Sequence, residues 1–571
     1  MLRRYLPILT WLPHYHRRLC GADLLAGLIV TVMVIPQSLA YAVLAGLPAV
    51  VGLYASLLPA LAYALLGTSR TLAVGPVAIV ALMTGAALSG VATPGTSDYL
   101  QAALVLSLLS GAILVLMGLL RMGFVANFLS HPVIAGFLSA SGILIAASQI
   151  GYLLGIELSA RDLLPRAAEL VRHLPRFHPP TLAIGLGSLF FLLLMRQYGR
   201  ETLRRLGLSR PLADLLTRAG PVFAVLATTL ITWHLDLAER GVAVIGDVPR
   251  GLPPLTLPGF DASLWQTLLV PALLISVVGF VESVSMGQML AARRRERISP
   301  NQELIGLGGA NLAAAFTAGM PVTGGLTRTV INFDAGAQTP LAGFFAALGI
   351  GAVTLFLTPA LYHLPIATLA ATITVSIITL IDLPMIRQTW RYSRSDFSAM
   401  AVTIFLTLVE GVEAGIISGV ALSIGLFLYR TSRPHSALVG RIPGTEHFRN
   451  VERHDTETAS HLALLRIDES LYFANARYLE DTVYDLVATR PELEHVVLIC
   501  SAVNLIDASA LESLDAINAR LKDSLVTLHL AEVKGPVMDQ LKRSDFLDDM
   551  TGRVFLSSYA AWRELARPPN G

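Results

Sequence analysis

One arginine lies in a part of the chain that otherwise consists of apolar and small residues. Arg328 occurs in Gly319-Met-Pro-Val-Thr-Gly-Gly-Leu-Thr-Arg-Thr329, behind an uncharged stretch from Leu304 to Thr327. A guanidinium at mid-bilayer costs roughly 2.5–3.5 kcal/mol even on insertion scales, so this side chain is expected to face a cavity or a partner. The proline and glycines before it break a helix, and a broken helix inside a membrane lines a site. A fixed positive charge beside a helix N-terminus predicts an anion site. The alternative is a structural arginine that reaches an interface or pairs with Asp334.

A second apolar segment, at Gly75-Pro76, is also interrupted by a glycine and a proline. Pro76 follows Gly75 and precedes the apolar run 77–83, which predicts a helix with proline at its first position. If this helix and the one expected from about Leu326 direct their N-termini at each other, two sets of unpaired N–H groups converge, each equivalent to roughly half a positive charge. Together with Arg328 they would form a site for a small anion. Further donors would be the hydroxyls of Thr327 and Thr323.

Glu282 is the only charged residue between Asp261 and Arg293. Burial in a low-dielectric environment disfavours the charged form of a carboxyl group, so such a group can exchange protons near neutral pH. Glu282 is therefore a candidate coupling group that binds H+ or a cation while the anion binds. The alternative is a structural carboxylate that pairs with Arg328 or with backbone donors.

A polar pair lies in the first long apolar run. Gln37 and Tyr41 are one helical turn apart and share a face, and Pro36 is expected to kink this helix. An amide and a phenol on a kinked helix can line a polar site, although hydrogen bonding between helices explains them equally well.

The composition indicates a polytopic membrane protein. The chain has 571 residues, of which 54% are hydrophobic and 14% charged. No Asp, Glu, Lys or Arg occurs in 24–69, 122–156 or 335–381, and each run holds about one or two spans of the ~20 residues that a bilayer requires. The net charge of +2 gives no argument for a nucleic-acid partner, and Cys20 and Cys500 form no metal or disulfide motif. We expect no cofactor. We also expect no cleavable signal peptide, because arginines precede the first apolar run.

About fourteen spans are expected, with the third and tenth short. They lie near residues 24–41, 50–66, 76–90, 100–120, 131–150, 181–195, 219–235, 268–290, 302–317, 326–337, 341–358, 365–381, 397–410 and 414–430. Most arginines lie between spans in islands that share one face if both termini are cytoplasmic, as the positive-inside rule requires. The loop 157–180 disagrees, because it would lie outside and carries four arginines. This topology predicts a multi-pass protein of the plasma (inner) membrane with cytoplasmic termini.

The interrupted segments at Gly75-Pro76 and at 321–325 lie about 250 residues apart, and the long spans 24–41 and 268–290 are offset by a similar amount. Seven spans separate the copies, so the repeats would be inverted in the membrane. Interrupted segments at corresponding positions of two repeats are typical of a transporter site.

Beyond about residue 435 the sequence is typical of a soluble domain. We expect a transmembrane transport domain over 1–435 and a cytosolic domain over 440–566. Strands are expected at 462–467, 471–473, 495–500, 526–533 and 554–556, with helices at 476–488, 508–522 and 537–541 and at the end of the chain. We find no P-loop, zinc spacing or catalytic motif, so this part is interpreted as a binding or regulatory module and not as an enzyme.

Taken together and in order, the membrane motifs resemble those of the sulfate permease (SulP) family, relatives of prestin and pendrin. These motifs are Asp23-Leu-Leu-Ala-Gly27, Val34-Ile-Pro-Gln-Ser-Leu-Ala-Tyr41, Gly67-Thr-Ser-Arg70, Val74-Gly-Pro76 and Pro321-Val-Thr-Gly-Gly-Leu-Thr-Arg-Thr329. The C-terminal part is similar to the STAS domain of that family, with Asp507-Ala-Ser-Ala510 as the loop that opens a helix.

The resemblance implies a seven-plus-seven inverted repeat with half-helices as third and tenth spans, a core domain that moves against a gate domain, and a homodimer. It places the anion between the two half-helices and matches Glu282 to the family glutamate linked to proton or cation coupling. Thr327 replaces the serine common in the family and keeps its hydroxyl. The lining residues that the resemblance implies are Gln37, Tyr41, Val77, Thr327 and Arg328.

The leading hypothesis is secondary active transport of an inorganic anion, sulfate as first candidate, by H+ symport or anion exchange with an elevator-like movement. Oxygen-rich anions would use more of the donors than a halide. Na+-coupled transport of bicarbonate or a dicarboxylate is the alternative within the same family. A nucleobase permease is a remoter alternative. It would need paired acidic residues facing the site for ring N–H groups, and Arg328 argues against it.

Overall fold

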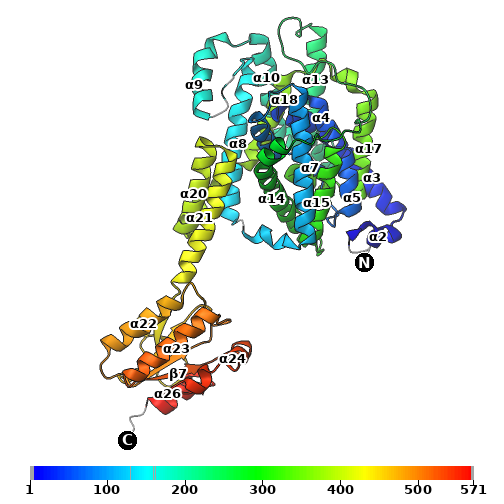
Figure 1. Cartoon of the computed structure of the whole chain (residues 1–571). Coiled ribbons are helices and arrows are strands. Elements are labelled where there is room, and N and C mark those ends of the chain that lie inside the picture. The colour runs from blue at the N-terminus through cyan, green and yellow to red at the C-terminus, as the bar shows by residue number, and fades with distance from the viewer. Residues whose placement is uncertain (1–4, 129, 159, 161–162, 567–571) are drawn as a thin grey trace. The chain divides into compact units, whose positions relative to one another are not determined.

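The computed structural model describes residues 5–128, 130–158, 160 and 163–566. The chain divides into two compact units over Met1–Ser423 and Ile424–Gly571 (Figure 1). The first, together with the helix that continues to Ser432, is called the membrane unit below, and the α/β domain that follows is called the soluble unit. A mostly helical membrane part followed by an α/β domain is the fold class that the sequence predicted.

Helices make up most of the membrane unit, and each of the fourteen expected spans overlaps one of them. They are α2 (Ile8–Trp11), α3 (Arg17–Leu44), α4 (Ala49–Tyr54), α5 (Leu58–Leu66), α6 (Ala78–Ser89), α7 (Ser97–Leu119), α8 (His131–Leu154), α9 (Leu163–His173), α10 (Pro179–Leu194), α11 (Arg200–Arg205), α12 (Arg210–Arg218), α13 (Gly220–His234), α14 (Ala262–Arg293), α15 (Pro300–Ala315), α16 (Leu326–Asp334), α17 (Leu341–Phe356), α18 (Ile366–Ile377), α19 (Leu383–Tyr392), α20 (Arg394–Val409) and α21 (Val412–Ser432). Among the described residues, eight helices are long and apolar enough to cross a membrane, and a bent pair at residues 212–234 would be a ninth.

The outer surface of this unit is apolar in a way that lipid explains. Phe190 on α10 and Leu226 and Leu230 on α13 are more than half exposed. Large apolar side chains exposed together are costly in water but are the ordinary surface of a helix that faces hydrocarbon.

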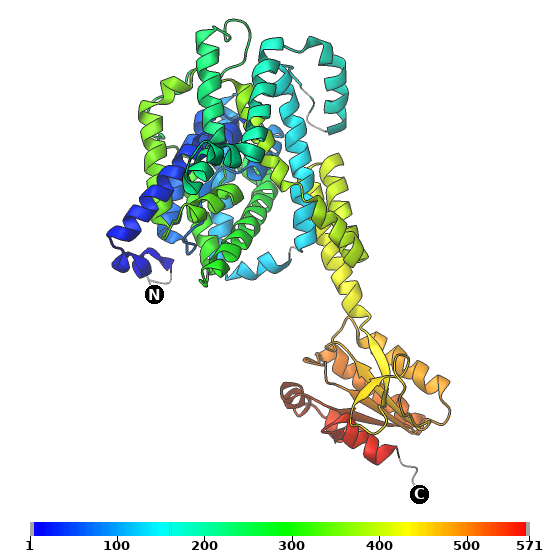
Figure 2. The ribbon, with the colours of Figure 1, turned by 180° about the vertical axis from the view of Figure 1, so that it is seen from behind.

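Two short strands bring distant parts of the membrane unit together. β1 (Val74–Gly75) pairs antiparallel with β2 (Thr323–Gly324), with Val74 opposite Gly324 and Gly75 opposite Thr323. Each strand leads within a few residues into a short helix, α6 or α16, so both halves of the chain supply a strand-then-helix unit. In both views the N-terminal α3 and the later α17 lie side by side, and they pack together (Figure 1, Figure 2).

The two short helices begin differently from each other. The tenth expected span starts at Leu326 as predicted. The prediction that proline opens the third span is wrong: α6 begins at Ala78, and Val77 is its N-cap with extended backbone at φ −129° and ψ 151°. The reason is the strand pairing, because it draws Gly75 into extended structure and the chain turns into the helix only after Val77.

Two buried carboxylates hold the chain segments next to the β1–β2 pairing. This pairing and the starts of α6 and α16 that follow it are called the crossing below. Glu303 on α15 accepts hydrogen bonds from the Thr68 backbone N–H (2.7 Å) and the Tyr63 hydroxyl (2.6 Å). Asp23 on α3 accepts from the Thr339 hydroxyl (2.6 Å) and the Gln338 backbone N–H (2.6 Å). Buried charges are tolerated where hydrogen bonds satisfy them, so these carboxylates hold the chain before β1 and after α16 in place.

The soluble unit contains a six-stranded sheet in the order β4-β3-β5-β6-β7-β8. Strands β5 to β8 are parallel to one another, and β3 is antiparallel to β4 and β5. The strands are β3 (Ser436–Arg441), β4 (Phe448–Asn450), β5 (Leu462–Ile467), β6 (His495–Ile499), β7 (Thr527–Ala531) and β8 (Val554–Phe555), and the helices are α22 (Ala476–Thr489), α23 (Ala508–Asp523), α24 (Gly535–Leu541), α25 (Phe546–Asp549) and α26 (Ser558–Leu565). Helices α22 and α23 pack on one face and α26 on the other.

The strand expected at 471–473 is not formed. Leu471 makes only an isolated parallel bridge to Ile506. The chain then turns, because the side chain of Asn475 accepts a hydrogen bond from the Tyr472 backbone N–H (3.0 Å). The N-cap of α23 is formed as its sequence suggests: Asp507 accepts from the Ala510 backbone N–H (2.9 Å).

The soluble unit is expected to lose stability in mild acid because of His529. Burial, reinforced by the neighbouring His495 and Arg553, lowers the pKa of the His529 imidazole from its ordinary 6.5 to about 4. Above pH 6.5 both folded and unfolded states are neutral here, but below it the unfolded state takes up the proton first. Stability is therefore complete near pH 7 and falls by about 2 kcal/mol by pH 5.

The measurement is the urea midpoint of the soluble unit in the full-length protein at pH 7 and at pH 5. Unfolding is followed by the hydrogen-exchange protection of β6 and β7. His529→Gln should reduce the acid sensitivity, whereas the exposed His447→Gln should leave it unchanged. An equal drop in all three proteins would show that another group is responsible.

Candidate functional site

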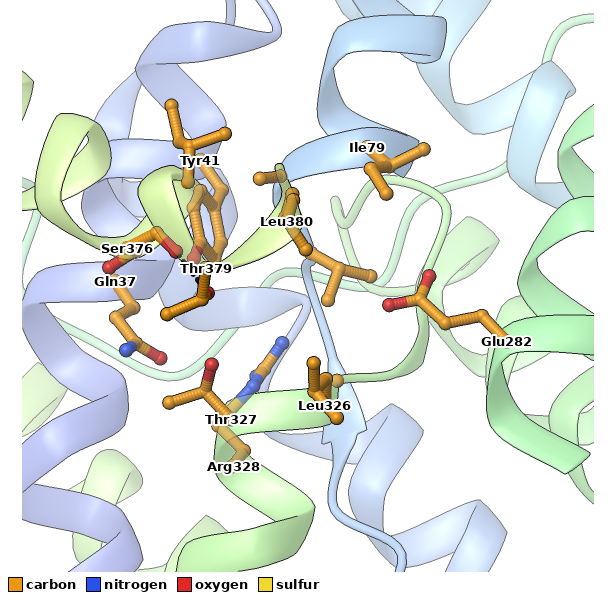
Figure 3. Close-up of a pocket in the computed structure, with 14 residues that line it drawn as sticks. Gln37, Tyr41, Ile79, Glu282, Leu326, Thr327, Arg328, Ser376, Thr379 and Leu380 are labelled. Carbon is orange, nitrogen blue, oxygen red and sulfur yellow. Dashed lines mark hydrogen bonds between the residues drawn. The ribbon is translucent and has the colours of Figure 1, made fainter. Parts of the chain in front are cut away.

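The N-termini of α6 and α16 open onto a small cavity of about 40 Å³. Its other walls are the middle of α3, one turn of α14 and the end of α18 (Figure 3). The residues that line it are Gln37, Tyr41, Val77, Ala78, Ile79, Glu282, Gly325, Leu326, Thr327, Arg328, Ser376, Ile377, Thr379 and Leu380. Six of the seven residues that the sequence assigned to the site line this cavity, namely Gln37, Tyr41, Val77, Glu282, Thr327 and Arg328.

Arg328 lies in the first turn of α16 and is only 3% exposed. Its guanidinium donates a hydrogen bond to the carbonyl oxygen of Pro76, so the arginine of one half of the chain is held by the broken segment of the other half. The alternative in which Arg328 pairs with Asp334 is not observed, since that carboxylate bonds to Arg218 at 2.8 Å. The buried positive charge therefore stands at the cavity wall without a carboxylate partner among the described residues.

The backbone at the crossing is held by specific partners, as irregular backbone within a membrane requires. Ala73 accepts from the Gly325 N–H (3.2 Å) and donates its own N–H to the Thr329 hydroxyl (3.2 Å). Neither N-cap, Val77 or Gly325, supplies a side-chain cap. The first-turn N–H groups of both helices are thus left for another acceptor, and two helix N-termini and a guanidinium give a positive field at one point.

Polar side chains complete one side of the cavity. Gln37 and Thr327 face it from α3 and α16, and Tyr41 lies close to Ser376 and Thr379 (Figure 3). Among the described residues, no hydrogen bond fixes the side chains of Gln37 or Thr327. An amide, a phenol and a hydroxyl beside a guanidinium are donors that suit the oxygens of a small oxyanion.

Thr323 does not line the cavity, so the sequence-based expectation that it donates to the anion is wrong. Its hydroxyl donates instead to the Gly279 carbonyl of α14 (2.6 Å) and lies 2.7 Å from the Ser283 hydroxyl. The pairing of β2 with β1 turns this side chain toward α14 and away from the cavity.

Ser376, Thr379 and Leu380 line the cavity from the end of α18 and were not singled out from the sequence. Their signal is weak, because serine and threonine are frequent in apolar helices. Both hydroxyls donate to backbone carbonyls of their own turn, Ser376 to Thr372 (2.9 Å) and Thr379 to Ser376 (2.7 Å). The sequence analysis also did not predict the change from α-helix to 3₁₀-helix at Ile378, and Thr379 and Leu380 line the cavity from this 3₁₀ segment.

Glu282 reaches the cavity from α14. Figure 3 shows its carboxyl group across Leu326 and Leu380 from Arg328. Its Oε2 is buried and has no hydrogen-bond partner among the described residues, and no ion pair joins it to Arg328. The structural alternative, a carboxylate satisfied by Arg328 or by backbone donors, is not what the structure contains. An unsatisfied buried carboxyl oxygen is costly when charged, which favours a role in proton exchange.

Gly75→Ala is expected to weaken anion binding about tenfold, equivalent to ~1.4 kcal/mol. A Cβ at this position would meet the Nη1 atom of Arg328, so the guanidinium has to move from its place at the cavity wall. The measurement is the Kd of labelled sulfate for the purified protein. Gly90→Ala at the other end of α6 is the matched control, because its Cβ would meet nothing closer than 3.7 Å. Equal affinities of the two variants would contradict the assigned position of Arg328.

Comparison with known proteins places this site in a family. The sulfate permease family matches residues 21–403 and the STAS domain family matches 453–561. Sulfate transporter 4.1, chloroplastic, of Arabidopsis thaliana is 33% identical over 556 residues, covering 95% of this chain and 79% of that protein. A probable sulfate transporter of Mycobacterium tuberculosis H37Rv is 32% identical over 536 residues, covering 94% of this chain and 93% of its own length.

Solved structures show the same fold. The overall structure of SLC26A9 superposes with a TM-score of 0.91 at 23% identity and covers 98% of this chain and 92% of its own. The transmembrane domain of the cyanobacterial bicarbonate transporter BicA gives a TM-score of 0.61 at 22% identity, with 71% of this chain and 98% of its own covered. The solved structures confirm the fold, and the family matches together with the sulfate transporter relatives confirm the family and the transporter interpretation reached from the sequence motifs. The chain belongs to the sulfate permease family and carries a C-terminal STAS domain.

Proposed function

We propose that this protein is a secondary active transporter of a small inorganic oxyanion, with sulfate as its substrate. The observation that carries the proposal is the buried Arg328 at the point where the N-termini of α6 and α16 converge on one cavity. This arrangement supplies positive charge and unpaired N–H donors, and no carboxylate of the part of the chain that the structure describes is bound to the guanidinium.

The choice of sulfate rests on two arguments. The relatives that align over most of the chain are named sulfate transporters. In addition, the guanidinium, the two helix ends and the side chains of Gln37, Tyr41 and Thr327 offer more donors than a halide uses. Val77 closes the cavity beside them as the N-cap of α6.

We propose that Glu282 couples proton binding to anion transport. The support is its buried, unpartnered oxygen in the cavity that also contains Arg328. Na+ is the alternative coupling ion and pure anion exchange the alternative mode. The movement that we propose is elevator-like, in which the part with α3, α6, α14 and α16 carries the anion past the part with α18.

We also propose the domain boundaries, the oligomeric state and the membrane orientation of the protein. Residues 1–435 form the transport domain and 440–566 the STAS domain, in a homodimer in the plasma (inner) membrane with both termini cytoplasmic. The distribution of arginines between the spans supports this orientation.

The test is uptake of labelled sulfate into proteoliposomes under an imposed inward proton gradient, with bicarbonate as competitor. Accumulation that depends on the gradient is the expected result. Bicarbonate movement that requires Na+, without sulfate uptake, would move the protein to the alternative substrate. Absence of any anion movement would contradict the proposal.

A further inference from the structure

A chain of hydrogen bonds joins α14 to β2, next to both halves of the site. The Ser283 Oγ lies 2.9 Å from the Gly324 backbone nitrogen and 2.7 Å from the Thr323 Oγ1, and that atom lies 2.6 Å from the Gly279 carbonyl oxygen. The two side chains are nearly inaccessible, at 1% and 2% exposure. Hydrogen bonds at such burial are electrostatically stronger than in water.

The donors and acceptors can be assigned without ambiguity. The Gly324 N–H can only donate and the Gly279 carbonyl can only accept. The Thr323 hydroxyl therefore donates to Gly279 and accepts from Ser283, whose oxygen accepts from Gly324. Each hydroxyl has one proton, so loss of either side chain interrupts the chain.

A close approach of the two elements makes this link short. Gly279 has no side chain, and a Cβ there would lie 2.9 Å from the Thr323 Oγ1. Glycine thus lets β2 rest directly on α14, and Ser283, one turn later on the same helix, secures it.

The link lies between the two functional groups of the site. Ser283 follows Glu282 in α14, and successive residues of a helix point about 100° apart, so one can face the cavity while the other holds β2. Gly324 immediately precedes Gly325, the N-cap of the helix that carries Arg328. The titratable groups that face Glu282 across the cavity are Arg328 from α16 and Tyr41 from α3, and α6 and α18 contribute uncharged residues.

We propose that Ser283 is a positioning residue that transmits the state of Glu282 to the N-terminus of α16, and so couples proton binding to anion affinity. The inference rests on the proposed function and deepens it. A shift of α14 on protonation of Glu282 would be passed to β2 and to the donors of α16 through the Ser283–Gly324 bond. Direct attraction between Glu282 and Arg328 remains when this bond is lost, so coupling should fall without disappearing.

The experiment measures the Kd of labelled sulfate for the purified full-length protein at pH 5.5 and pH 7.5. In the wild type we expect sulfate to bind about tenfold more tightly at the lower pH, within the usual range of coupling between two sites. In Ser283→Ala the ratio should fall below about threefold. A purely structural role would weaken binding equally at both pH values and leave the ratio unchanged.

Two further variants keep the test decisive. Thr323→Ala removes the next hydroxyl and should lower the ratio in the same direction, and the double variant should show no additional loss because both act in one chain. Ser276→Ala is the matched control: it is on the same helix, equally buried, and bonded to Ser110 (2.8 Å) away from the cavity. Its pH ratio should equal that of the wild type.

The outcomes separate the inference from the function on which it rests. A wild-type ratio that persists in Ser283→Ala and Thr323→Ala, or that falls equally in Ser276→Ala, overturns the inference alone. A wild type that binds sulfate equally at both pH values overturns proton coupling and this inference together. No sulfate binding at either pH contradicts the proposed function, and the inference falls with it.

Discussion

Arg328→Gln is expected to weaken sulfate binding about a hundredfold and to abolish measurable uptake at micromolar sulfate. A hydrogen bond to a charged group contributes ~1.5–3 kcal/mol, and the guanidinium supplies the only full positive charge among the lining residues of the cavity. Glutamine removes the charge but keeps a polar side chain longer than that of alanine, so it leaves less empty space beside the Pro76 carbonyl. The measurement is the Kd of labelled sulfate together with the rate of sulfate–sulfate exchange.

Arg294→Gln provides the matched control for this variant. Arg294 also donates to a backbone carbonyl, that of Ala337 at 2.5 Å, and its guanidinium lies over the Phe333 ring at 4.5 Å. It is a partly buried structural arginine outside the cavity, so its loss should change stability but leave the Kd within about twofold. Normal sulfate binding by Arg328→Gln would remove the basis of the anion site.

Glu282→Gln is expected to abolish accumulation of sulfate driven by a proton gradient while exchange continues. A gradient of one pH unit supplies ~1.4 kcal/mol for each coupled proton, which corresponds to about tenfold accumulation when the membrane potential is held at zero. Glutamine resembles the protonated carboxyl group but cannot release a proton, so the gradient no longer drives net movement. Exchange requires only that the loaded carrier returns, and should remain within severalfold of the wild type.

The control for this variant is Glu296→Gln, which removes a partly exposed carboxylate just beyond the end of α14. Its ion pair with Arg70 (3.2 Å) is of the surface type that contributes little. Gradient-driven accumulation should survive in this variant. Should Glu282→Gln still accumulate sulfate against its gradient, the coupling group lies elsewhere.

The main features of the site could be predicted because the sequence violates the rules of an ordinary membrane helix there. Arg328 is a charge in an apolar segment, Glu282 is alone in a long span, and the Gly-Pro and Pro-to-Gly interruptions mark broken helices. Each of these features is costly in a bilayer, so its presence in the sequence indicates a function. The cavity brings Arg328 and Glu282 together at the start of the two helices that follow these interruptions.

Other features depend on packing between distant segments and leave little trace in the sequence. The β1–β2 pairing joins residues about 250 positions apart through backbone groups, so side chains do not encode it. It moved the start of α6 to Ala78 and turned Thr323 away from the cavity. Ser376 and Thr379 were missed because hydroxyls in apolar helices commonly bond to their own backbone and so carry no distinctive pattern.

In the soluble unit, too, the strands that only pairing with other segments identifies were not predicted from the sequence. Strands β5 to β8 are central or strongly apolar, and the sequence predicted each of them. β3 and β4 were not predicted, since their polar residues alternate irregularly and only the pairing of β3 with β5 and of β4 with β3 identifies them. The strand expected at 471–473 was wrong because a short apolar run does not distinguish a strand from a turn.

We propose that the transported oxyanion binds between the N-termini of α6 and α16 beside Arg328. The most direct test is a structure of the protein with selenate, a sulfate analogue that anomalous scattering locates. We expect selenium density in the cavity within hydrogen-bond distance of the Arg328 guanidinium and the first-turn N–H groups of both helices. Selenium located away from this cavity, or the same occupancy in Arg328→Gln crystals, would contradict it.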